Sequence, residues 1–562
     1  MVTANNGFTQ RVSAMLQRHG RIVSTSVVTT GEDMDAAITA ADPDLILCPY
    51  LTARIPTRIY STRSCLIFHP GPVGDRGPSS LDWAIINEDP VWGVTVLEAG
   101  EEMDGGAVWA SRTFILPVQR KSDAYNGIIA SAGLQCLLEA ADRALDPEFV
   151  PTAQDRAHRP VAHASERPLM TQTDRAFDWA EHADVVLRHI RSGDGFPGVR
   201  STLAELPVYL YDAHPSHREQ QSGQPGDIIG RHHHGVEVAC GESSSVWIGH
   251  LRARIGDTMS CKAPASAVLA AAGIRLAATP PTLDPAWTDM RYERCGAVGT
   301  ITVEAYNGAL STDMCLRLAE LIRFASRQDT RVLVLRSRGS FFLTGIHLGQ
   351  IEIVERPHDE AWHNICAIND VCRSLLLCSS QITIAAIGAN AAAGGLMLGL
   401  GADIAVARRD VVLTPSYSPM GLTGSELHSY TLPRRVGRRT AIELLSEPAP
   451  IDADSAAAIG LVDQVGPGDD FDEWVADLAT RTAAPPVWNK QISDKSVRLT
   501  MDFSHNPLSA YEFAELGEMS HDIFGDRRGF DSKRAALMFK RSSSPRTYHR
   551  AVHPPKAASP RR

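Results

Sequence analysis

The stretch "CLIFHPGPVGDRGPSSLDWAI", residues 65–85, decides how the first part of the chain folds. It begins with an apolar run typical of a buried strand and continues into a loop rich in Gly and Pro. His69 stands where that strand ends. In doubly wound α/β sheets, ligands bind at the carboxyl ends of the strands. The stretch therefore predicts an α/β unit with a candidate site around His69.

The flanking sequence extends this pattern in both directions. "RIVSTSVV", "DLILCPYL" and "WGVTVLEA" are further short β-rich runs, and they alternate with helical or turn stretches such as "FTQRVSAMLQRHG". Strands that alternate with helices favour a parallel, doubly wound sheet. With the helix "AYNGIIASAGLQCLLEAADRAL" and a polar connector, we place this first α/β domain at residues 1–165.

The rest of the chain divides into a small β domain and a second α/β domain. Closely spaced short strands over residues 166–280 indicate a small β-barrel of OB-like type. The Pro-rich "ATPPTLDPAW", 278–287, is the predicted boundary, and strands and helices alternate again over residues 288–545. The end, residues 546–562, is basic and rich in Pro and Ser, which predicts a disordered tail. The fold class is therefore multidomain α/β.

Composition excludes several classes of protein. The chain has 562 residues, a net charge of -10, 44% hydrophobic and 21% charged residues, which describes an ordinary soluble globular protein rather than one that coats nucleic acid. Ten cysteines without a C-x-x-C pair indicate reduced thiols. The start lacks the layout of a signal peptide, and no apolar run approaches the roughly 18 residues that span a membrane. We expect a cytoplasmic protein.

The first candidate site pairs His69 with an aspartate further along the chain. "WGVTVLEAGEEMDGGAVW", 92–109, reads as a strand, a turn and a returning strand, with Asp104 just before two glycines. A histidine held by a carboxylate can act as a general base near neutral pH. The alternative is a surface-loop histidine and an unrelated turn aspartate.

The order of these parts resembles the folate-dependent formyltransferases over roughly residues 1–280. The resemblance includes "RPLMTQTDRAFDWAEHADVVLRHIRSGDGFPGV", 167–199, at the start of the barrel domain. It implies that His69 and Asp104 handle protons while formyl leaves N10 of tetrahydrofolate. The family has an asparagine two residues before the histidine, and Ile67 stands there in this chain. Isoleucine cannot donate a hydrogen bond to an oxyanion, and Leu97 likewise replaces a commonly polar residue.

Two further loops of the first domain are candidate ligand sites. "RGPSS", 76–80, offers Arg76 and Gly77 for the donor or for phosphate groups of coenzyme A. "NNGFTQR", 5–11, lies at a strand-to-helix turn, where Asn6 and Gln10 are weaker ligand candidates. A loop anchor and a simple helix cap are the respective alternatives.

The second candidate site lies in the second α/β domain. "RGSFFLTGIHLGQ", 338–350, and "IGANAAAGGLMLGLGADIAVA", 387–407, combine a strand end with a small-residue turn that enters a helix. N–H groups at such a helix start can hold an oxyanion, whereas the alternative is a tightly packed Gly/Ala helix. With "VEAYNGALSTDM" and "AIELLSEPAPIDADSAAAIGLVDQV", these segments resemble the crotonase superfamily over about 290–480. The resemblance places the two oxyanion-hole amides at Thr344 and Gly394.

The acid–base residues of that superfamily do not carry over. Its two glutamates fall on Met397 and Tyr417, and a thioether cannot activate water. Glu426, in "MGLTGSELHSYTLPRRVG", is a carboxylate in the segment that borders the superfamily's pocket. Glu426 and Tyr417 are therefore the candidates for altered proton chemistry, with a surface or helix-start residue as the alternative for Glu426.

The order of the two halves resembles the HypX/HoxX family of hydrogenase maturation factors. The resemblance implies formyl transfer from N10-formyl-tetrahydrofolate to coenzyme A, decarbonylation of formyl-CoA to CO, and a role beside other [NiFe]-hydrogenase maturation proteins. One alternative is a specialised-metabolism formyltransferase that acts on an amine, with the crotonase half acting on another CoA ester. The other is a scaffold that only binds folate or CoA. No metal site is predicted, because the consecutive His232 to His234 cannot share one ion.

Overall fold

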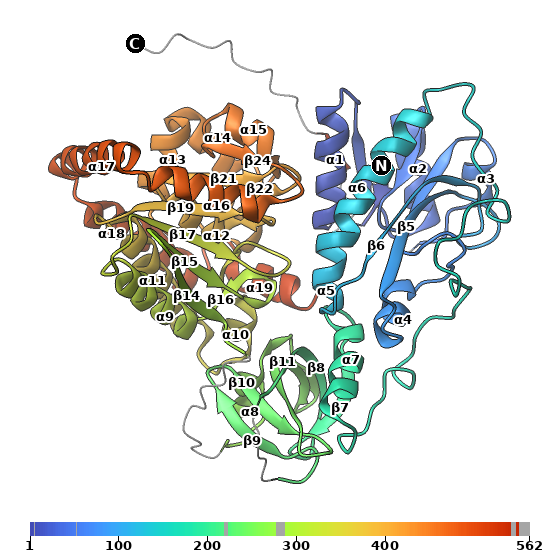
Figure 1. Cartoon of the computed structure of the whole chain (residues 1–562), viewed down its shortest axis with the longest axis horizontal. Helices are drawn as coiled ribbons and strands as arrows, with labels where there is room; N and C mark the ends of the chain where they lie inside the picture. Colours follow the sequence, from blue (N-terminus) through green and yellow to red (C-terminus); the bar gives the residue numbers. More distant parts are fainter. Residues whose placement is uncertain (5, 52, 218–222, 277–286, 541–546, 550–562) are drawn as a thin grey trace.

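Two α/β units lie side by side, and a small β unit joins them at one end (Figure 1). The computed structural model describes residues 1–562 apart from 5, 52, 218–222, 277–286, 541–546 and 550–562. The N-terminal unit carries α1 and α6 on the side that faces the C-terminal unit (Figure 1). The middle unit contacts both of the others, so all three meet at one junction.

The N-terminal unit contains a mixed sheet in the order β3-β4-β5-β6, with bounds Ile46–Cys48, Cys65–His69, Val91–Glu98 and Val108–Ile115. β3 and β4 are parallel, whereas β5 runs antiparallel to β4 and β6 antiparallel to β5. The predicted parallel pairing therefore holds for β3 and β4 and is wrong for β5 and β6. Residues 99–107 join β5 to β6, and this connection is too short for the crossover that a parallel pair needs.

Two long helices cover this sheet. α1 spans Gly7–Arg18 and α6 spans Ala130–Arg143, and both contribute buried residues to the same core as β4. The rings of Phe8 and Phe68 have centroids 4.9 Å apart within that core. A side chain on Gly133 of α6 would collide with both rings, so the glycine lets the helix approach the sheet closely.

The middle unit is an antiparallel sheet packed against α7 and against the short helix α8 (Ala265–Ala271). The helix α7 spans Ala183–Gly193, and the strand order is β7-β8-β11-β10-β9, with bounds Val199–Leu203, Leu206–Pro215, Ser245–Ile255, Gly235–Ala239 and Ile228–His232. Apolar side chains of the strands and of α7 form one core. Closure of this sheet into an OB-like barrel stays a prediction.

The C-terminal unit contains a six-stranded sheet in the order β14-β15-β17-β19-β21-β24. The strands span Met290–Cys295, Val298–Val303, Val332–Ser337, Ile382–Ile387, Ile404–Arg408 and Gln464–Gly466. β15 to β24 are parallel, and β19 is buried along its whole length, as expected for a strand covered on both faces. The principal helices are α9 (Thr312–Ala325), α11 (Pro357–Leu376), α12 (Ala393–Leu400), α13 (His428–Val436), α16 (Phe471–Thr482), α17 (Pro485–His505) and α18 (Leu508–Phe524).

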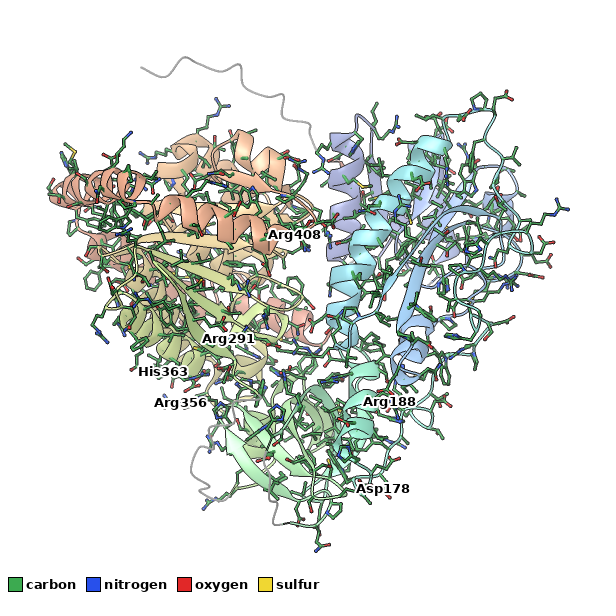
Figure 2. The ribbon with its side chains drawn as sticks, viewed as in Figure 1. Asp178, Arg188, Arg291, Arg356, His363 and Arg408 are labelled. Atoms are coloured by element: carbon green, nitrogen blue, oxygen red, sulfur yellow. The ribbon has the colours of Figure 1, made fainter. Side chains whose placement is uncertain are left out.

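Direct ion pairs hold α1 against the C-terminal unit. The buried guanidinium of Arg11 binds the carboxylate of Asp410, 2.5 Å away, and the carbonyl of Asn126. Arg408, on the other side of Asp410, lies on the face that points toward the N-terminal unit (Figure 2). Asp410 lies just after the end of β21, so the Arg11–Asp410 ion pair fixes α1 against the C-terminal end of that strand.

The end of the chain departs from its prediction. Residues Thr547–His549 form β25, which pairs antiparallel with β2 (Ser24–Val27), so the predicted disordered tail is wrong for these three residues. β2 pairs with β1 (Val2–Thr3) on its other edge, so it is the central strand of this small sheet. The remaining residues of the predicted tail, 546 and 550–562, lie outside the described residues.

Two properties of the whole chain bear on its chemistry. All ten cysteines lie in the described part, all are free thiols, and the closest pair, Cys48 and Cys65, has its sulfurs 3.9 Å apart. Among the helices in the described ranges, none combines the length and apolar character needed to cross a bilayer.

Candidate functional site

The first site is built around His69 at the carboxyl end of β4. The side chain is buried, and each ring nitrogen faces a carboxylate: Nε2 lies 2.8 Å from Oδ2 of Asp75, and Nδ1 lies 3.4 Å from Oδ2 of Asp104. The structure therefore brings His69 and Asp104 together, as the sequence predicts. Such an arrangement can take up and release a proton inside the protein.

Asp104 is held by the loop that follows His69. It occupies the turn between β5 and β6 with φ of 51°, and the N–H of Gly77 donates to its Oδ2 across 3.1 Å. Gly77 has φ of 108°, and a Cβ there would lie closer than 3.0 Å to the carbonyl oxygen of Arg167. Only glycine fits this position, so Gly77 positions the carboxylate through its backbone.

The other predicted ligands of the first domain are engaged by the protein. Arg76 forms an ion pair with Glu102, 2.9 Å away, beside the turn that carries Asp104. Asn6 is the N-cap of α1, and its side chain accepts the N–H of Thr9 at 2.8 Å. Asn6 therefore acts as the helix cap that the sequence offers as the alternative, because its oxygen satisfies an orphan amide of the helix, and its binding of a ligand stays a prediction. Gln10 follows in the same helix.

The second site is built around Glu426. Its carboxylate is buried, and its Oε2 accepts the hydroxyl of Tyr417 at 2.8 Å and the N–H of Ser425 at 3.1 Å. Burial raises the pKa of Glu426 to about 7, although the hydrogen bond from Tyr417 acts against this shift. A carboxyl group with this pKa can exchange a proton near neutral pH.

Gly394 lies directly beneath this carboxylate. A Cβ on Gly394 would lie closer than 3.0 Å to Oε1 of Glu426. Gly394 is in the first turn of α12, where the amides have no preceding helical carbonyl as partner. The structure therefore places an amide at a helix start beside an acid–base group, on the side where Met397 is fully buried and offers no carboxylate.

Thr344 does not provide the free amide that the sequence predicts. Its N–H donates to the carbonyl of Gly308 across 2.7 Å, and its Oγ1 donates to the carbonyl of Asn307. The adjacent β18 (Gly345–Ile346) pairs with β16 (Ala309–Leu310), which draws the Thr344 amide into the same ladder. The expectation of a second free oxyanion donor at Thr344 is therefore wrong in this structure.

Several residues around these sites were missed from the sequence. Asp75 contacts His69, and its signal is only a carboxylate in a tight loop after the histidine. Asn369 of α11 accepts the N–H of Glu426 at 2.8 Å and the hydroxyl of Ser425. Glu515 of α18 accepts the N–H of Leu427 at 2.9 Å, and burial raises its pKa to about 7. Asn369 and Glu515 lie far from Glu426 in sequence, so spacing could not associate them.

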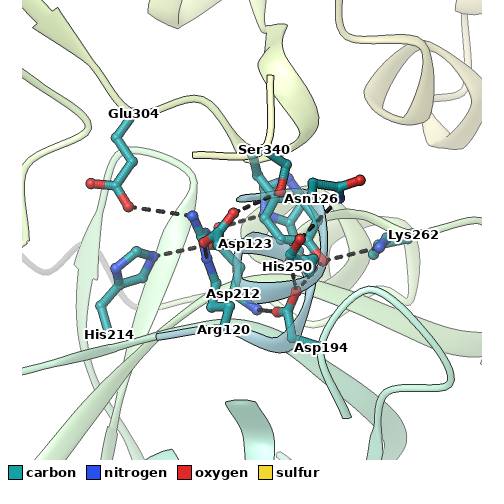
Figure 3. A network of polar contacts seen from close by, with 12 residues as sticks. Arg120, Asp123, Asn126, Asp194, Asp212, His214, His250, Lys262, Glu304 and Ser340 are labelled. Atoms are coloured by element: carbon teal, nitrogen blue, oxygen red, sulfur yellow. Dashed lines mark hydrogen bonds and ion pairs between the residues drawn. The ribbon is translucent and has the colours of Figure 1, made fainter. Parts of the chain in front are cut away.

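A polar network joins the three units at their junction (Figure 3). The buried guanidinium of Arg120 contacts Asp123 of its own unit, Asp212 of the middle unit and Glu304 of the C-terminal unit. Lys262 donates to the hydroxyl of Tyr306, 3.0 Å away. These contacts tie the three folds together between the two sites.

One group at this junction has the spacing of metal ligands. Ligand atoms of Asp212, His234 and His250 lie within 4.8 Å of one another. However, Asp212 already binds Arg120 and accepts from His214 and His250, and Nε2 of His250 lies 3.3 Å from Nε2 of His347. A bound arginine opposes a cation at the same carboxylate, so we assign no metal to it.

Comparison with known proteins shows which protein families the parts of this chain are similar to. Residues 295–517 match the enoyl-CoA hydratase/isomerase family, and residues 169–267 match the formyl transferase C-terminal domain. The hydrogenase maturation factor HoxX of Bradyrhizobium diazoefficiens is 34% identical over 523 residues, covering 92% of this chain and 90% of that protein. The methionyl-tRNA formyltransferase of Citrifermentans bemidjiense is 26% identical over 238 residues, covering 42% of this chain and 72% of that protein.

A solved structure agrees with the whole architecture. The crystal structure of HypX from Aquifex aeolicus in complex with tetrahydrofolic acid superposes with a TM-score of 0.89 at 32% identity. The superposition covers 97% of this chain and 96% of the Aquifex aeolicus chain. The similarity therefore includes both α/β units and the middle unit.

Proposed function

Because the chain belongs to the HypX/HoxX family of hydrogenase maturation factors, we propose that it makes carbon monoxide in two steps at two sites. The first site transfers formyl from N10-formyl-tetrahydrofolate to the thiol of coenzyme A. The second site releases CO from formyl-CoA. The observation that carries this proposal is the Glu426 and Tyr417 pair above Gly394, in a crotonase-like pocket that has methionine where a hydratase carboxylate is expected.

The first step requires a proton to move from sulfur to nitrogen. The thiol sulfur forms a bond to the formyl carbon, and the bond between that carbon and N10 breaks. The thiol loses its proton and N10 gains one, so His69 and Asp104 are suited to carry it between them. Tetrahydrofolate bound to the Aquifex aeolicus HypX supports folate as the donor.

The second step is a redox-neutral elimination. Formyl-CoA loses the proton of its formyl carbon, the C–S bond breaks with its electrons on sulfur, and sulfur is protonated to give CO and free CoA. We assign the formyl proton to Glu426, which later returns it to sulfur, and the carbonyl oxygen to the amide of Gly394. Tyr417 holds the ionised carboxylate in place through its hydrogen bond.

The same pocket disfavours the competing hydrolysis of the thioester. Enoyl-CoA hydratases activate water with paired carboxylates, and Met397 occupies one of those positions here. A thioether does not deprotonate water. A site with methionine at one of the two hydratase glutamate positions therefore suits a reaction that must exclude water. The CO formed would serve [NiFe]-hydrogenase maturation, which is the role of the family. The protein would act in the cytoplasm, as the sequence predicts.

The test is CO release by the purified full chain. Protein is incubated with N10-formyl-tetrahydrofolate, with and without CoA, while CO is measured by haemoglobin binding and tetrahydrofolate by absorbance. We expect CoA-dependent formation of both products. Tetrahydrofolate formation without CO, with a formylated amine found instead, would favour the amine formyltransferase. No turnover by folded, folate-binding protein would favour the scaffold.

Two variants separate the steps. His69→Gln should abolish tetrahydrofolate formation, whereas added formyl-CoA should still yield CO. Glu426→Gln should retain tetrahydrofolate formation and lose CO from either substrate. If both variants lost the same step, the assignment of one reaction to each site would be wrong.

A further inference from the structure

His69 makes its closest polar contact with a residue that the proposed reaction does not use. Oδ2 of Asp75 lies 2.8 Å from Nε2 of His69, whereas Asp104 lies 3.4 Å from Nδ1. The Asp75 side chain is 1% exposed, and that of Asp104 is 15% exposed. The imidazole therefore has a closed side at Asp75 and a more open side at Asp104.

The loop after β4 holds Asp75 against Nε2 of His69. A Cβ on Gly71 would lie closer than 3.0 Å to Oδ2 of Asp75 and to Nε2 of His69, so glycine leaves room for their contact. The carbonyl of Gly71 accepts the hydroxyl of Thr95 at 2.8 Å, and the carbonyl of Pro70 accepts Trp92 Nε1–H at 3.0 Å. These bonds fix the loop, so the position of Asp75 is determined by the fold.

The contact determines which ring nitrogen carries the proton. An ionised carboxylate only accepts hydrogen bonds, so Nε2 must be the donor toward Asp75. Oδ2 of Asp104, 3.4 Å from Nδ1, accepts the N–H of Gly77, so the shorter contact to Asp75 places the proton of a neutral imidazole on Nε2 and the lone pair on Nδ1. Nδ1 is thus the nitrogen on the more exposed side.

We infer that Asp75 is a positioning residue which keeps the proton of His69 on Nε2, so that Nδ1 is the atom that takes the substrate proton beside Asp104. The inference rests on the proposed function in one respect, namely that the substrate proton comes from the thiol of coenzyme A.

Other charged groups near the loop do not take over this role. Within the described part of the chain, the two carboxylates paired with His69 are Asp75 and Asp104. Asp89 is close enough for the charge of Asp75 to act on it, but its own partner is His163, 2.6 Å away. Arg159 lies over Gly74, where a Cβ would be 3.2 Å from its Nε. Asp89 therefore provides a matched control: a buried aspartate of the same region without contact to the imidazole.

The first test reads the tautomer directly and needs no turnover. The full chain is labelled with ¹⁵N in its histidine rings, and the His69 signals are assigned by their loss in His69→Gln. We expect a protonated Nε2 and an unprotonated Nδ1 at pH 8. A proton on Nδ1, alone or together with one on Nε2, would overturn the inference.

The second test uses the kinetics of tetrahydrofolate formation. An amide at position 75 can donate to Nε2 and so permits the other tautomer, so Asp75→Asn should lower kcat by about 100-fold or more. The KM for the folate should change less than about two-fold, since Asp75 faces away from the open side.

The remaining variants distinguish positioning from folding. Asp89→Asn should leave kcat unchanged, and Asp75→Glu, which keeps a carboxylate that only accepts hydrogen bonds, should retain the proton on Nε2. A loss of activity in Asp75→Asn with the His69 proton still on Nε2 alone would overturn the inference in favour of a purely structural role. Wild-type protein without any folate turnover would defeat the proposed function, while the tautomer measurement would still decide the role of Asp75.

Discussion

The hydroxyl of Tyr417 donates to Oε2 of Glu426 across 2.8 Å, and both side chains are buried. Burial raises the pKa of each group, and the negative charge of Glu426 raises that of Tyr417 further. Tyr417 therefore stays protonated and acts as a donor, while Glu426 is the member of the pair that exchanges protons. The relationship assigns different roles to two residues that are nine positions apart.

Removing the carboxylate should stop the second step alone. We expect Glu426→Gln to lower CO release from formyl-CoA by about 100-fold or more, because the amide cannot accept the formyl proton. Tetrahydrofolate formation should be unchanged. Glu512→Gln, which alters a carboxylate of α18 that binds Arg373, is the control and should retain CO release. Equal activity of the two variants would contradict the assignment of Glu426.

The pH dependence of CO release should follow Glu426. Since its pKa is about 7 and the carboxylate form is the base, CO release from formyl-CoA should rise as pH increases through about 7. The Tyr417 hydrogen bond lowers this pKa, so Tyr417→Phe should move the rising limb to higher pH, by about half to one unit. Initial rates between pH 5.5 and 9 check this, and a limb displaced to lower pH would be inconsistent with Tyr417 as donor.

A methyl group on Gly394 should disable the second site without affecting the first. The Cβ of Gly394→Ala would lie closer than 3.0 Å to Oε1 of Glu426, so the carboxylate must move away from the helix start. We expect CO release to fall by about 100-fold or more. Gly468→Ala, whose Cβ would enter open space, is the matched control. Unchanged CO release in Gly394→Ala would show that this amide binds no reacting group.

The first site contains an equivalent glycine. In Gly71→Ala the Cβ would separate His69 from Asp75 and should lower tetrahydrofolate formation, with a cost in stability of about 1–3 kcal/mol from overpacking. CO release from added formyl-CoA should persist. Gly100→Ala has no neighbour within 4 Å of its Cβ and should match the wild type in both assays. A Gly71→Ala protein with normal folate turnover would count against the role of the His69–Asp75 contact.

Acid should destabilise the junction between the units. Burial lowers the pKa of His347 to about 3 and that of His234 to about 4. A histidine in the unfolded chain has a pKa of about 6.5, so below this pH the unfolded state binds protons that the folded state does not bind. Stability should therefore fall on acidification from about pH 6.5, by about 1.4 kcal/mol per pH unit for each histidine.

Urea unfolding of wild type and variants at pH 7.5, 6 and 5 measures this slope. His234→Gln should remove one histidine's share, because glutamine does not titrate. His363→Gln alters an exposed histidine of α11 and should leave the slope unchanged. A steeper slope in His234→Gln than in the wild type would contradict the burial argument.

Local sequence was sufficient for the order of the folds and for the residues next to each strand end. His69 follows an apolar run and Asp104 precedes two glycines, and the structure places their side chains in contact. It was insufficient for Thr344, because whether an amide is free depends on which carbonyl the neighbouring strand presents. The parallel pairing predicted for the first domain holds for β3 and β4 but fails for β5 and β6, since strand direction depends on the connections between strands rather than on composition.

The sequence by itself determined which chemical groups this protein has: a histidine and an aspartate around one β-strand loop, and a glutamate and a tyrosine around one small-residue helix. These depend on residue type and short spacing, which are written in the chain. Only the tertiary structure decided that Asp75 closes one side of His69, that Glu426 lies over Gly394, and that Arg120 joins the three units. The physical reason is that burial, direction and hydrogen-bond partners arise from segments far apart in the sequence, and these set the proton chemistry of each group.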